Sequence, residues 1–162
     1  MPEETMLELR PFTAIGATAL HGPAAMLPGL PPRPGWAPVA GATAIWTAPG
    51  TWLCLHAPGA PPPVAEAQRT PMDGSRAVFE LSGPLAREAL ATILPLDLHP
   101  RAFPDGAAAA TLAAQIPLLL WRDGAAFRLA CARSYGASLR AALLAAGRGR
   151  GLVERDPVPW PA

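Results

Sequence analysis

Three side chains that can bind an anion or exchange a proton alternate along one short segment: Asp97, His99 and Arg101. A guanidinium in such a segment can hold the carboxylate of a ligand or of a partner protein through two parallel hydrogen bonds. The alternative is structural, with an internal Asp97–Arg101 ion pair that shapes the segment and His99 held against Pro100. The spacing favours the internal pair and leaves the binding role open.

The other histidines and the two cysteines form no set that is typical of a catalytic or metal site. His21 and His56 have no cysteine or histidine at the spacing of zinc ligands. No glycine-rich loop for a nucleotide phosphate follows a strand, and scattered residues do not define a Ser–His–acid triad. We therefore expect no catalytic residue, no bound cofactor and no metal in this chain. Cys54 and Cys131 lie in apolar runs and are expected to be buried free thiols.

Tryptophan is frequent in this chain, which has five. Those in predicted strands are expected in the core: Trp46, Trp52 and Trp121. Trp36 and Trp160 lie in proline-rich irregular segments, where a single domain could hardly bury them. Tryptophan is a favoured anchor of protein interfaces, so contact with a partner is favoured over packing on their own domain. Together with the segment described above, the predicted partner contacts are Trp36, His99, Arg101 and Trp160.

The composition sets limits on partners. Charged residues make up 15% of the 162 residues, against about 25% in an average soluble domain. Two explanations stay open: a partner covers much of the surface, or a GC-rich genome raises alanine and arginine, since every one of the 13 basic residues is arginine. The net charge is +1 and the arginines are scattered, which argues against a nucleic-acid partner.

Neither a membrane span nor an export signal is expected. The longest apolar stretch, residues 107–121, contains Thr111, Gln115 and Pro117 and is too short to cross a bilayer. Residues 1–10 carry three glutamates in place of the basic and apolar regions of a signal peptide. These patterns predict a cytoplasmic protein that does not bind membranes.

Residues 1–70 are predicted to be a proline-rich part that contains one β-hairpin. Six prolines between residues 22 and 38 exclude a long helix there and indicate an extended connector. Residues 12–20 are typical of a strand interrupted by Gly16. The hairpin is formed by two apolar runs around a Pro-Gly turn, 42–47 and 52–55, and a short polar helix is predicted over 64–69.

The pattern is clearer in residues 71–147, which are predicted to form the α+β core of a single domain spanning 1–162. The expected order is β-α-β-β-β-α, with mostly antiparallel strands and two main helices. The predicted strands and helices are 76–81 (strand), 84–94 (helix), 107–114, 117–122 and 126–132 (strands), and 134–146 (helix). Residues 148–162 are expected to be an irregular tail.

Residues 73–146 resemble the gamma subunits of heterotetrameric sarcosine oxidases. The resemblance is carried mainly by these segments: Asp73-Gly74-Ser75-Arg76, Leu81-Ser82-Gly83-Pro84, Pro95-Leu96-Asp97-Leu98-His99-Pro100-Arg101-Ala102-Phe103 and Pro117-Leu118-Leu119-Leu120-Trp121-Arg122. It implies a fold similar to the folate-binding domain of the aminomethyltransferase of the glycine cleavage system. It also implies alpha, beta and delta partner subunits that hold FAD, covalent FMN, NAD, tetrahydrofolate and zinc. Such assemblies oxidise sarcosine to glycine and reduce oxygen to peroxide.

The chain departs from the wider folate-binding pattern at one turn. Aminomethyltransferases have a glycine-rich segment there, followed by an acidic residue that meets the folate. Residues 113–118 of this chain are shorter and contain no carboxylate. The resemblance therefore implies an accessory, non-catalytic gamma-type subunit of an enzyme that acts on sarcosine or a related secondary amine. A folate-binding module with its own ligand site is the alternative, and a stand-alone enzyme is the least favoured interpretation.

Overall fold

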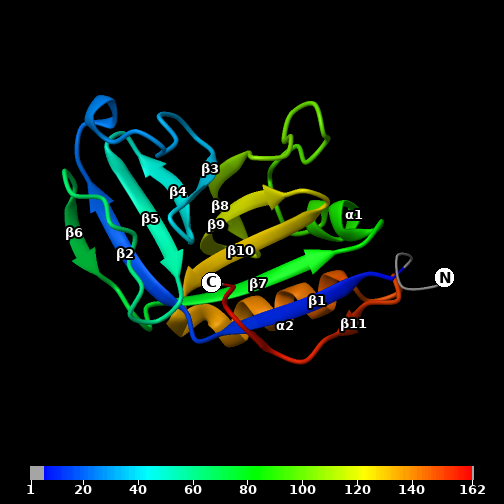
Figure 1. The fold of residues 1–162 in the computed structure, drawn as a ribbon. Helices are drawn as coiled ribbons and strands as arrows, with labels where there is room; N and C mark the ends of the chain where they lie inside the picture. The colour runs from blue at the N-terminus through cyan, green and yellow to red at the C-terminus, as the bar shows by residue number, and fades with distance from the viewer. Residues whose placement is uncertain (1–5, 162) are drawn as a thin grey trace.

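The computed structural model describes residues 6–161, which fold into two β-sheets and two α-helices (Figure 1). In spatial order, the larger sheet contains β11 (Val153–Glu154), β1 (Glu8–Thr13), β7 (Arg76–Ser82), β10 (Ala126–Ala132), β9 (Ile116–Asp123) and β8 (Ala108–Ala113), with β12 (Val158–Pro159) also paired to β1. The smaller sheet contains β3 (Trp36–Val39), β4 (Ala42–Ala48), β5 (Thr51–His56), β2 (Gly16–His21) and β6 (Gln68–Pro71). The helices are α1 (Ala86–Ala91) and α2 (Gly136–Ala146).

The elements stack in layers because the central strands of the larger sheet carry apolar side chains on both faces. Along β10, Phe127 and Leu129 pack toward α1 and α2, while Ala130 packs toward the smaller sheet. A third apolar cluster covers the other face of the smaller sheet and includes Trp52 of β5 and Leu27 of the proline-rich connector. The helices, the two sheets and the connector thus form successive layers, which Figure 1 shows in part.

The predicted order of the second half is confirmed, and with it the α+β class. The structure has β7, α1, β8, β9, β10 and α2 in that sequence. Helix α1 ends at Ala91 and not at residue 94; the backbone N–H and the hydroxyl of Thr92 both donate to the carbonyl of Ala89, which closes the last turn. Between β8 and β9 the chain reverses at Ala114 and Gln115, both with positive φ, as in a tight hairpin.

The first part of the chain differs from two sequence predictions. The single strand expected over 12–20 is two strands, because the chain turns at Ala14 (φ 50°) and passes from the larger sheet to the smaller one. The helix predicted over 64–69 is wrong: residues 68–71 form strand β6, which pairs with β2. The predicted hairpin is confirmed as β4 and β5. Since β1 lies in the larger sheet, the core includes residues that come before residue 70.

The tail expected to be irregular contains two short strands. Strands β11 and β12 both run parallel to β1, and the backbone N–H of Trp160 donates to the carbonyl of Thr13 (2.8 Å). The prediction that a single domain could hardly bury Trp160 is therefore wrong. Its ring is 4% exposed and packs edge-on against Phe12 (4.9 Å between centroids) and Trp121 (6.3 Å). Within residues 6–161, neither helix has the length and hydropathy needed to cross a membrane.

Candidate functional site

The segment with Asp97, His99 and Arg101 is a tight loop stabilised by side-chain acceptors. The Asp97 carboxylate accepts the backbone N–H of His99 (2.9 Å), and His99 Nδ1 accepts the backbone N–H of Arg101 (3.2 Å). These bonds replace the predicted Asp97–Arg101 ion pair, because each acceptor reaches the N–H two residues further along the chain. The side chains of His99 and Arg101 are exposed.

Apolar anchors hold this loop, residues 97–105, against the protein. Leu98 (3% exposed) and Phe103 (5%) enter the core beneath α1, and the backbone N–H of Phe103 closes a turn on the carbonyl of His99 (2.8 Å). Burying these two side chains fixes the loop at both ends, so that its polar side chains point to solvent. Arg101 makes no side-chain hydrogen bond or ion pair with any residue between 6 and 161.

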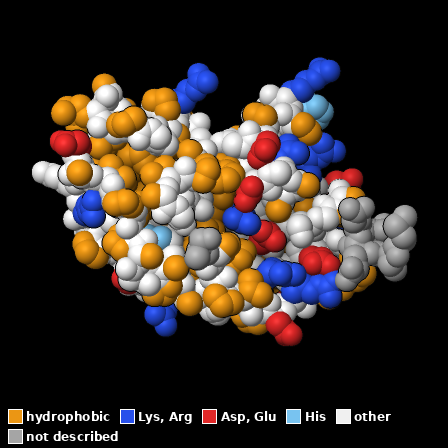
Figure 2. All heavy atoms as spheres, viewed as in Figure 1, with side chains coloured by type: hydrophobic (Ala, Val, Ile, Leu, Met, Phe, Trp, Pro, Cys, Tyr) orange, Lys and Arg blue, Asp and Glu red, His pale blue; other side chains and the backbone are white. Residues whose placement is uncertain are grey.

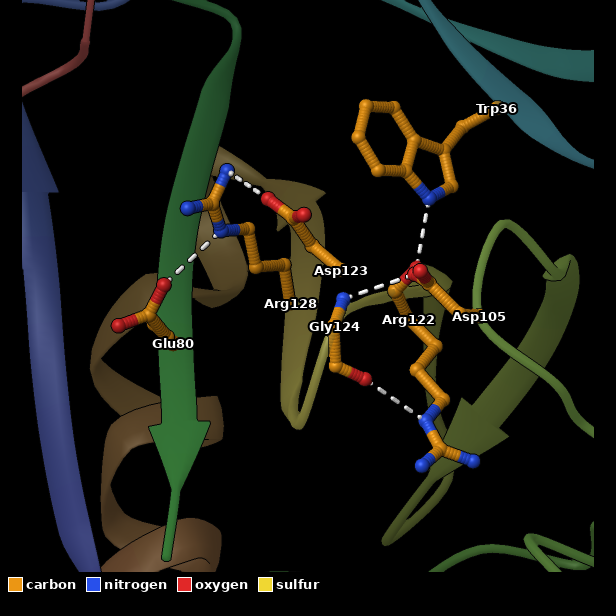
Figure 3. A network of polar contacts seen from close by, with 7 residues as sticks. All are labelled: Trp36, Glu80, Asp105, Arg122, Asp123, Gly124 and Arg128. Carbon is orange, nitrogen blue, oxygen red and sulfur yellow. Dashed lines mark hydrogen bonds and ion pairs between the residues drawn. The ribbon is translucent and has the colours of Figure 1, made fainter. Parts of the chain in front are cut away.

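Trp36 is tied to the same loop from the smaller sheet (Figure 3). Its ring N–H donates to the carbonyl of Arg122 (2.6 Å), and its backbone N–H donates to the carbonyl of Gly106 (3.1 Å). The guanidinium of Arg122 in turn donates to the carbonyl of Phe103 (3.0 Å), and the carboxylate of Asp105 accepts the backbone N–H of Gly124 (2.8 Å). The structure thus brings Trp36, which is half-buried, to the loop that carries His99 and Arg101.

A groove lies on each side of this loop. One groove, of about 600 Å³, runs between residues 31–36 and residues 102–109, where Trp36 forms part of the wall. Figure 2 shows a notch between the two lobes of the molecule at the top of the view. The other groove, of about 970 Å³, lies at the end of the larger sheet where β1 begins and β7 ends. Of the four predicted partner contacts, Trp36, His99 and Arg101 lie on or beside these grooves, and Trp160 does not.

The larger groove is basic, and we call it the arginine groove. Its lining residues are Met6, Glu8, Arg10, Ser82, Gly83, Pro84, Arg87, Leu98, Pro100, Arg122, Ala125, Phe127 and Arg155. The lining contains four arginines and one glutamate, Glu8. Arg155 pairs with Glu8, and the hydrogen bond from Arg155 holds the pKa of the Glu8 carboxyl below its usual value, so this carboxylate stays charged at neutral pH. Arg87 is exposed and has no ion pair or hydrogen bond through its side chain among residues 6–161.

Sequence reasoning missed this groove because its arginines are far apart along the chain. They come from β1, α1, β9 and the tail, and each one alone is typical of an ordinary solvated residue. The only local signal is the loop itself, since Leu98 and Pro100 form one wall. No sequence pattern indicates that the tail lies beside β1 and places Arg155 there.

Arg128, which does not line the arginine groove, lies largely buried on the face of β10 that points away from α2. Its guanidinium bonds to Glu80 (2.9 Å) and pairs with Asp123 (3.0 Å), as Figure 3 shows. It also lies over the rings of Phe12 (5.6 Å to the centroid) and Trp160 (5.5 Å). With 17% of its side chain exposed, this cation links four strands and the tail.

We expect Arg128→Met to lower the free energy of unfolding by about 2–3 kcal/mol, because it leaves Glu80 and Asp123 as partly buried carboxylates without their cation. Urea unfolding measures this loss. The matched control is Arg140→Met, which removes an exposed ion pair with Glu154 and should change stability little. Equal losses in the two variants would show that Arg128 is no more important to the fold than a surface ion pair.

His56 and the two cysteines, which could carry a proton or act as nucleophiles, are buried within the fold. His56 is buried, bonded to the hydroxyl of Thr18 (2.9 Å) and to the carbonyl of Ala57 (2.8 Å). Both cysteines are buried free thiols, as predicted. Burial raises the pKa of Cys54 to about 12 and also raises that of Cys131, so both thiols stay protonated at neutral pH and are poor nucleophiles. Between residues 6 and 161, no three His, Cys, Asp or Glu side chains are grouped to hold a metal ion.

Comparison with known proteins gives a consistent set of relatives, although no protein-family model matches the chain. It is 38% identical over 131 residues to the sarcosine oxidase subunit gamma of an Arthrobacter species, an alignment that covers 69% of this chain and 64% of the relative. It is 39% identical over 95 residues to the sarcosine oxidase subunit gamma of Corynebacterium sp. strain P-1, covering 53% of this chain and 46% of the relative. The chain thus spans less than two thirds of the length of these relatives.

Two solved structures share the fold of this chain. A chain of the heterotetrameric sarcosine oxidase from Corynebacterium sp. U-96, in complex with pyrrole 2-carboxylate, superposes with a TM-score of 0.76 at 28% identity, covering 90% of this chain and 86% of that one. The aminomethyltransferase T of the glycine cleavage system from Bartonella henselae shares the fold, with a TM-score of 0.64 at 17% identity over 93% of this chain and 48% of that one. The chain is therefore related to sarcosine oxidase gamma subunits in sequence, and it shares its fold with a chain of the heterotetrameric enzyme.

Proposed function

We propose that this chain is a non-catalytic accessory subunit of a multi-subunit flavoenzyme of the sarcosine oxidase type. The observation that carries the proposal is the likeness to the heterotetrameric enzyme, which extends over 90% of the chain in fold and is accompanied by 28% sequence identity. The buried and hydrogen-bonded side chain of His56 and the protonated thiols of both cysteines support a structural role. The assembly would act on sarcosine or a related secondary amine.

The partners in this proposal are alpha, beta and delta subunits, and the cofactors belong to them. FAD, FMN, NAD and tetrahydrofolate would be bound by the large subunits and zinc by the smallest, as the resemblance of the sequence implies. The assembly would be cytoplasmic, which two buried thiols without a disulfide support.

An unprotected sheet edge supports assembly with other subunits. Strand β8 lies at the edge of the larger sheet and reads Ala-Ala-Ala-Thr-Leu-Ala, with neither a charge nor a proline. Leu112 on this strand is 47% exposed. Proteins usually block such edges, because unpaired N–H and C=O groups pair readily with another chain. A partner subunit that covers β8 would remove this liability.

A folate-binding module remains the second candidate, favoured by the arginine groove and by the fold shared with an aminomethyltransferase. Folate carries carboxylates that arginines can hold. Calorimetric titration of the isolated chain with tetrahydrofolate separates the two candidates. Heat from a stoichiometric site would support the module, whereas no heat at several hundred micromolar ligand would leave the accessory subunit.

The accessory role is tested by size-exclusion chromatography with absorbance at 280 nm and at about 450 nm, where flavins absorb. The chain is produced alone and then together with the products of its neighbouring genes. We expect a colourless protein alone and co-elution with a yellow complex when it is co-expressed. A clean monomer that never joins a flavin-containing complex would contradict the proposal.

A further inference from the structure

The arginine groove concentrates positive charge at one end of the larger sheet. Its lining has four arginines and one glutamate, a formal charge of +3, in a chain whose total is +1. The rest of the chain is therefore net negative by about two charges at neutral pH, with histidines neutral. A concentrated charge of this kind raises the encounter rate with a partner of opposite sign and selects against partners of the same sign.

This positive charge is only partly neutralised within the chain. Glu8 is shared by Arg155 and, at 4.0 Å, by Arg10. Arg87 makes no side-chain bond within residues 6–161, and neither does Arg101, which is exposed next to Pro100 on the groove wall. Two guanidinium groups thus remain available to carboxylates from outside.

The shape of the groove favours a segment of a protein over a small molecule. Pockets for small ligands enclose most of the ligand surface, whereas the side chains of Arg10 and Arg155 at this groove are 39% and 37% exposed. Apolar residues with exposed surface also line the groove, among them Met6 (39% exposed), Pro84 and Pro100, and the guanidinium of Arg122 lies 5.8 Å from the centre of the Phe127 ring. An open basic groove with exposed apolar residues in its lining fits a chain that alternates carboxylates with an apolar side chain.

We propose that the arginine groove, with Arg101 at its rim, docks an acidic extended segment of a large partner subunit. This inference rests on the proposed accessory role and adds the surface and the chemistry by which the chain joins the assembly. Arg87 and Arg101 form the contacts that an incoming carboxylate meets first, and the exposed surface of Met6, Pro84 and Pro100 receives an apolar side chain between the carboxylates.

The test uses the double variant Arg87→Glu/Arg101→Glu of the full chain, co-expressed with the neighbouring gene products. The matched control is Arg69→Glu/Arg133→Glu, which makes the same change in net charge at two exposed arginines away from the groove, on β6 and at the far end of β10. Circular dichroism and thermal melting confirm that both variants fold. We expect the groove variant to be recovered in the flavin-containing complex at least ten-fold less than the wild type, and the control to be recovered normally.

A direct binding measurement accompanies the co-expression. A fluorescent peptide of alternating glutamate and leucine should bind the isolated wild-type chain, weaken steeply as salt rises, and bind the groove variant at least ten-fold more weakly. The same peptide with lysine in place of glutamate should not bind. Tetrahydrofolate that competes with the acidic peptide would assign the groove to a small anionic ligand instead and overturn the proposal.

The outcomes distinguish a failure of the docking surface from a failure of the accessory role. If the wild-type chain itself does not join a flavin-containing complex, the accessory role fails and the docking proposal fails with it. If the wild type joins and the groove variant joins equally well, the accessory role stands and the arginine groove is not the docking surface. If the groove variant and the control are recovered in the flavin-containing complex at equally reduced levels, assembly depends on net charge alone, and the proposal is also overturned.

Discussion

Replacing Trp160 by alanine is expected to lower the free energy of unfolding by about 3–5 kcal/mol. The indole is 4% exposed and fills the space between Phe12 and Trp121, beneath the guanidinium of Arg128. Its removal leaves a cavity, takes away two aromatic contacts and weakens the attachment of the tail to β1. Urea unfolding followed by circular dichroism measures the loss, and we expect the melting temperature to fall by roughly 10 °C.

The matched control for this prediction is Tyr135→Ala, because Tyr135 is an aromatic residue that is 46% exposed. Tyr135→Ala is expected to change the free energy of unfolding by no more than about 0.5 kcal/mol. The sequence alone favours a different result, in which Trp160→Ala weakens assembly and leaves the isolated fold intact. A Trp160→Ala chain that melts like the wild type but no longer joins its complex would therefore support the sequence-based hypothesis against the structure.

Gly83→Ala is expected to lower the free energy of unfolding by at least about 3 kcal/mol, because backbone strain and a steric clash add together. Gly83 has φ +103°, which side chains rarely adopt, and an added Cβ would lie 2.1 Å from the carbonyl oxygen of Met6. That atom belongs to the backbone just before β1, so it cannot move without shifting the strand away from β7. The midpoint of urea unfolding measures the effect, and a loss of the first strand from the sheet would appear as faster amide exchange in β1.

Gly124→Ala provides the control for backbone strain alone. Gly124 also has a positive φ, +61°, but an added Cβ would meet no atom within 4 Å. Gly124→Ala is expected to lower the free energy of unfolding by about 1–2 kcal/mol, because alanine is strained at this φ although its Cβ meets no other atom. If the two variants lose equal stability, the close approach of Gly83 to the start of β1 does not matter energetically. Because Gly83 lines the arginine groove, the same contact also defines one wall of the proposed docking surface.

The strands and helices of the second half follow from local patterns. Residues 126–132 are recognisable as a strand because successive side chains of a strand point to opposite faces. The larger apolar residues Phe127, Leu129 and Cys131 therefore recur at every second position, on the face that packs against the helices. The Pro-Gly and Asp-Gly turns mark hairpins for the same local reason. The polar segment 64–69 carries no strand signal because β6 is an exposed edge strand, in which no residue is buried and no apolar alternation is required.

The predicted site residues also differ in whether their exposure depends on local sequence or on distant contacts. His99 and Arg101 were found because polar residues between prolines in a loop point to solvent, and Trp36 lies beside that loop because the layers meet there. Whether any of the three contacts a partner stays a prediction. The burial of Trp160 is not predictable from the sequence because it depends on a strand pairing that no nearby residue signals.

The sequence by itself determined the α+β order, the buried thiols and the exposed loop, since each depends on neighbours within a few positions in the chain. Tertiary structure alone decided that the tail runs parallel to β1, that Trp160 completes the core, and that arginines from β1, α1, β9 and the tail surround one groove. The physical reason is the same in all three cases. Contacts between residues as far apart as Glu8 and Arg155 leave no periodic trace in either segment, and only the packing of the layers brings them together.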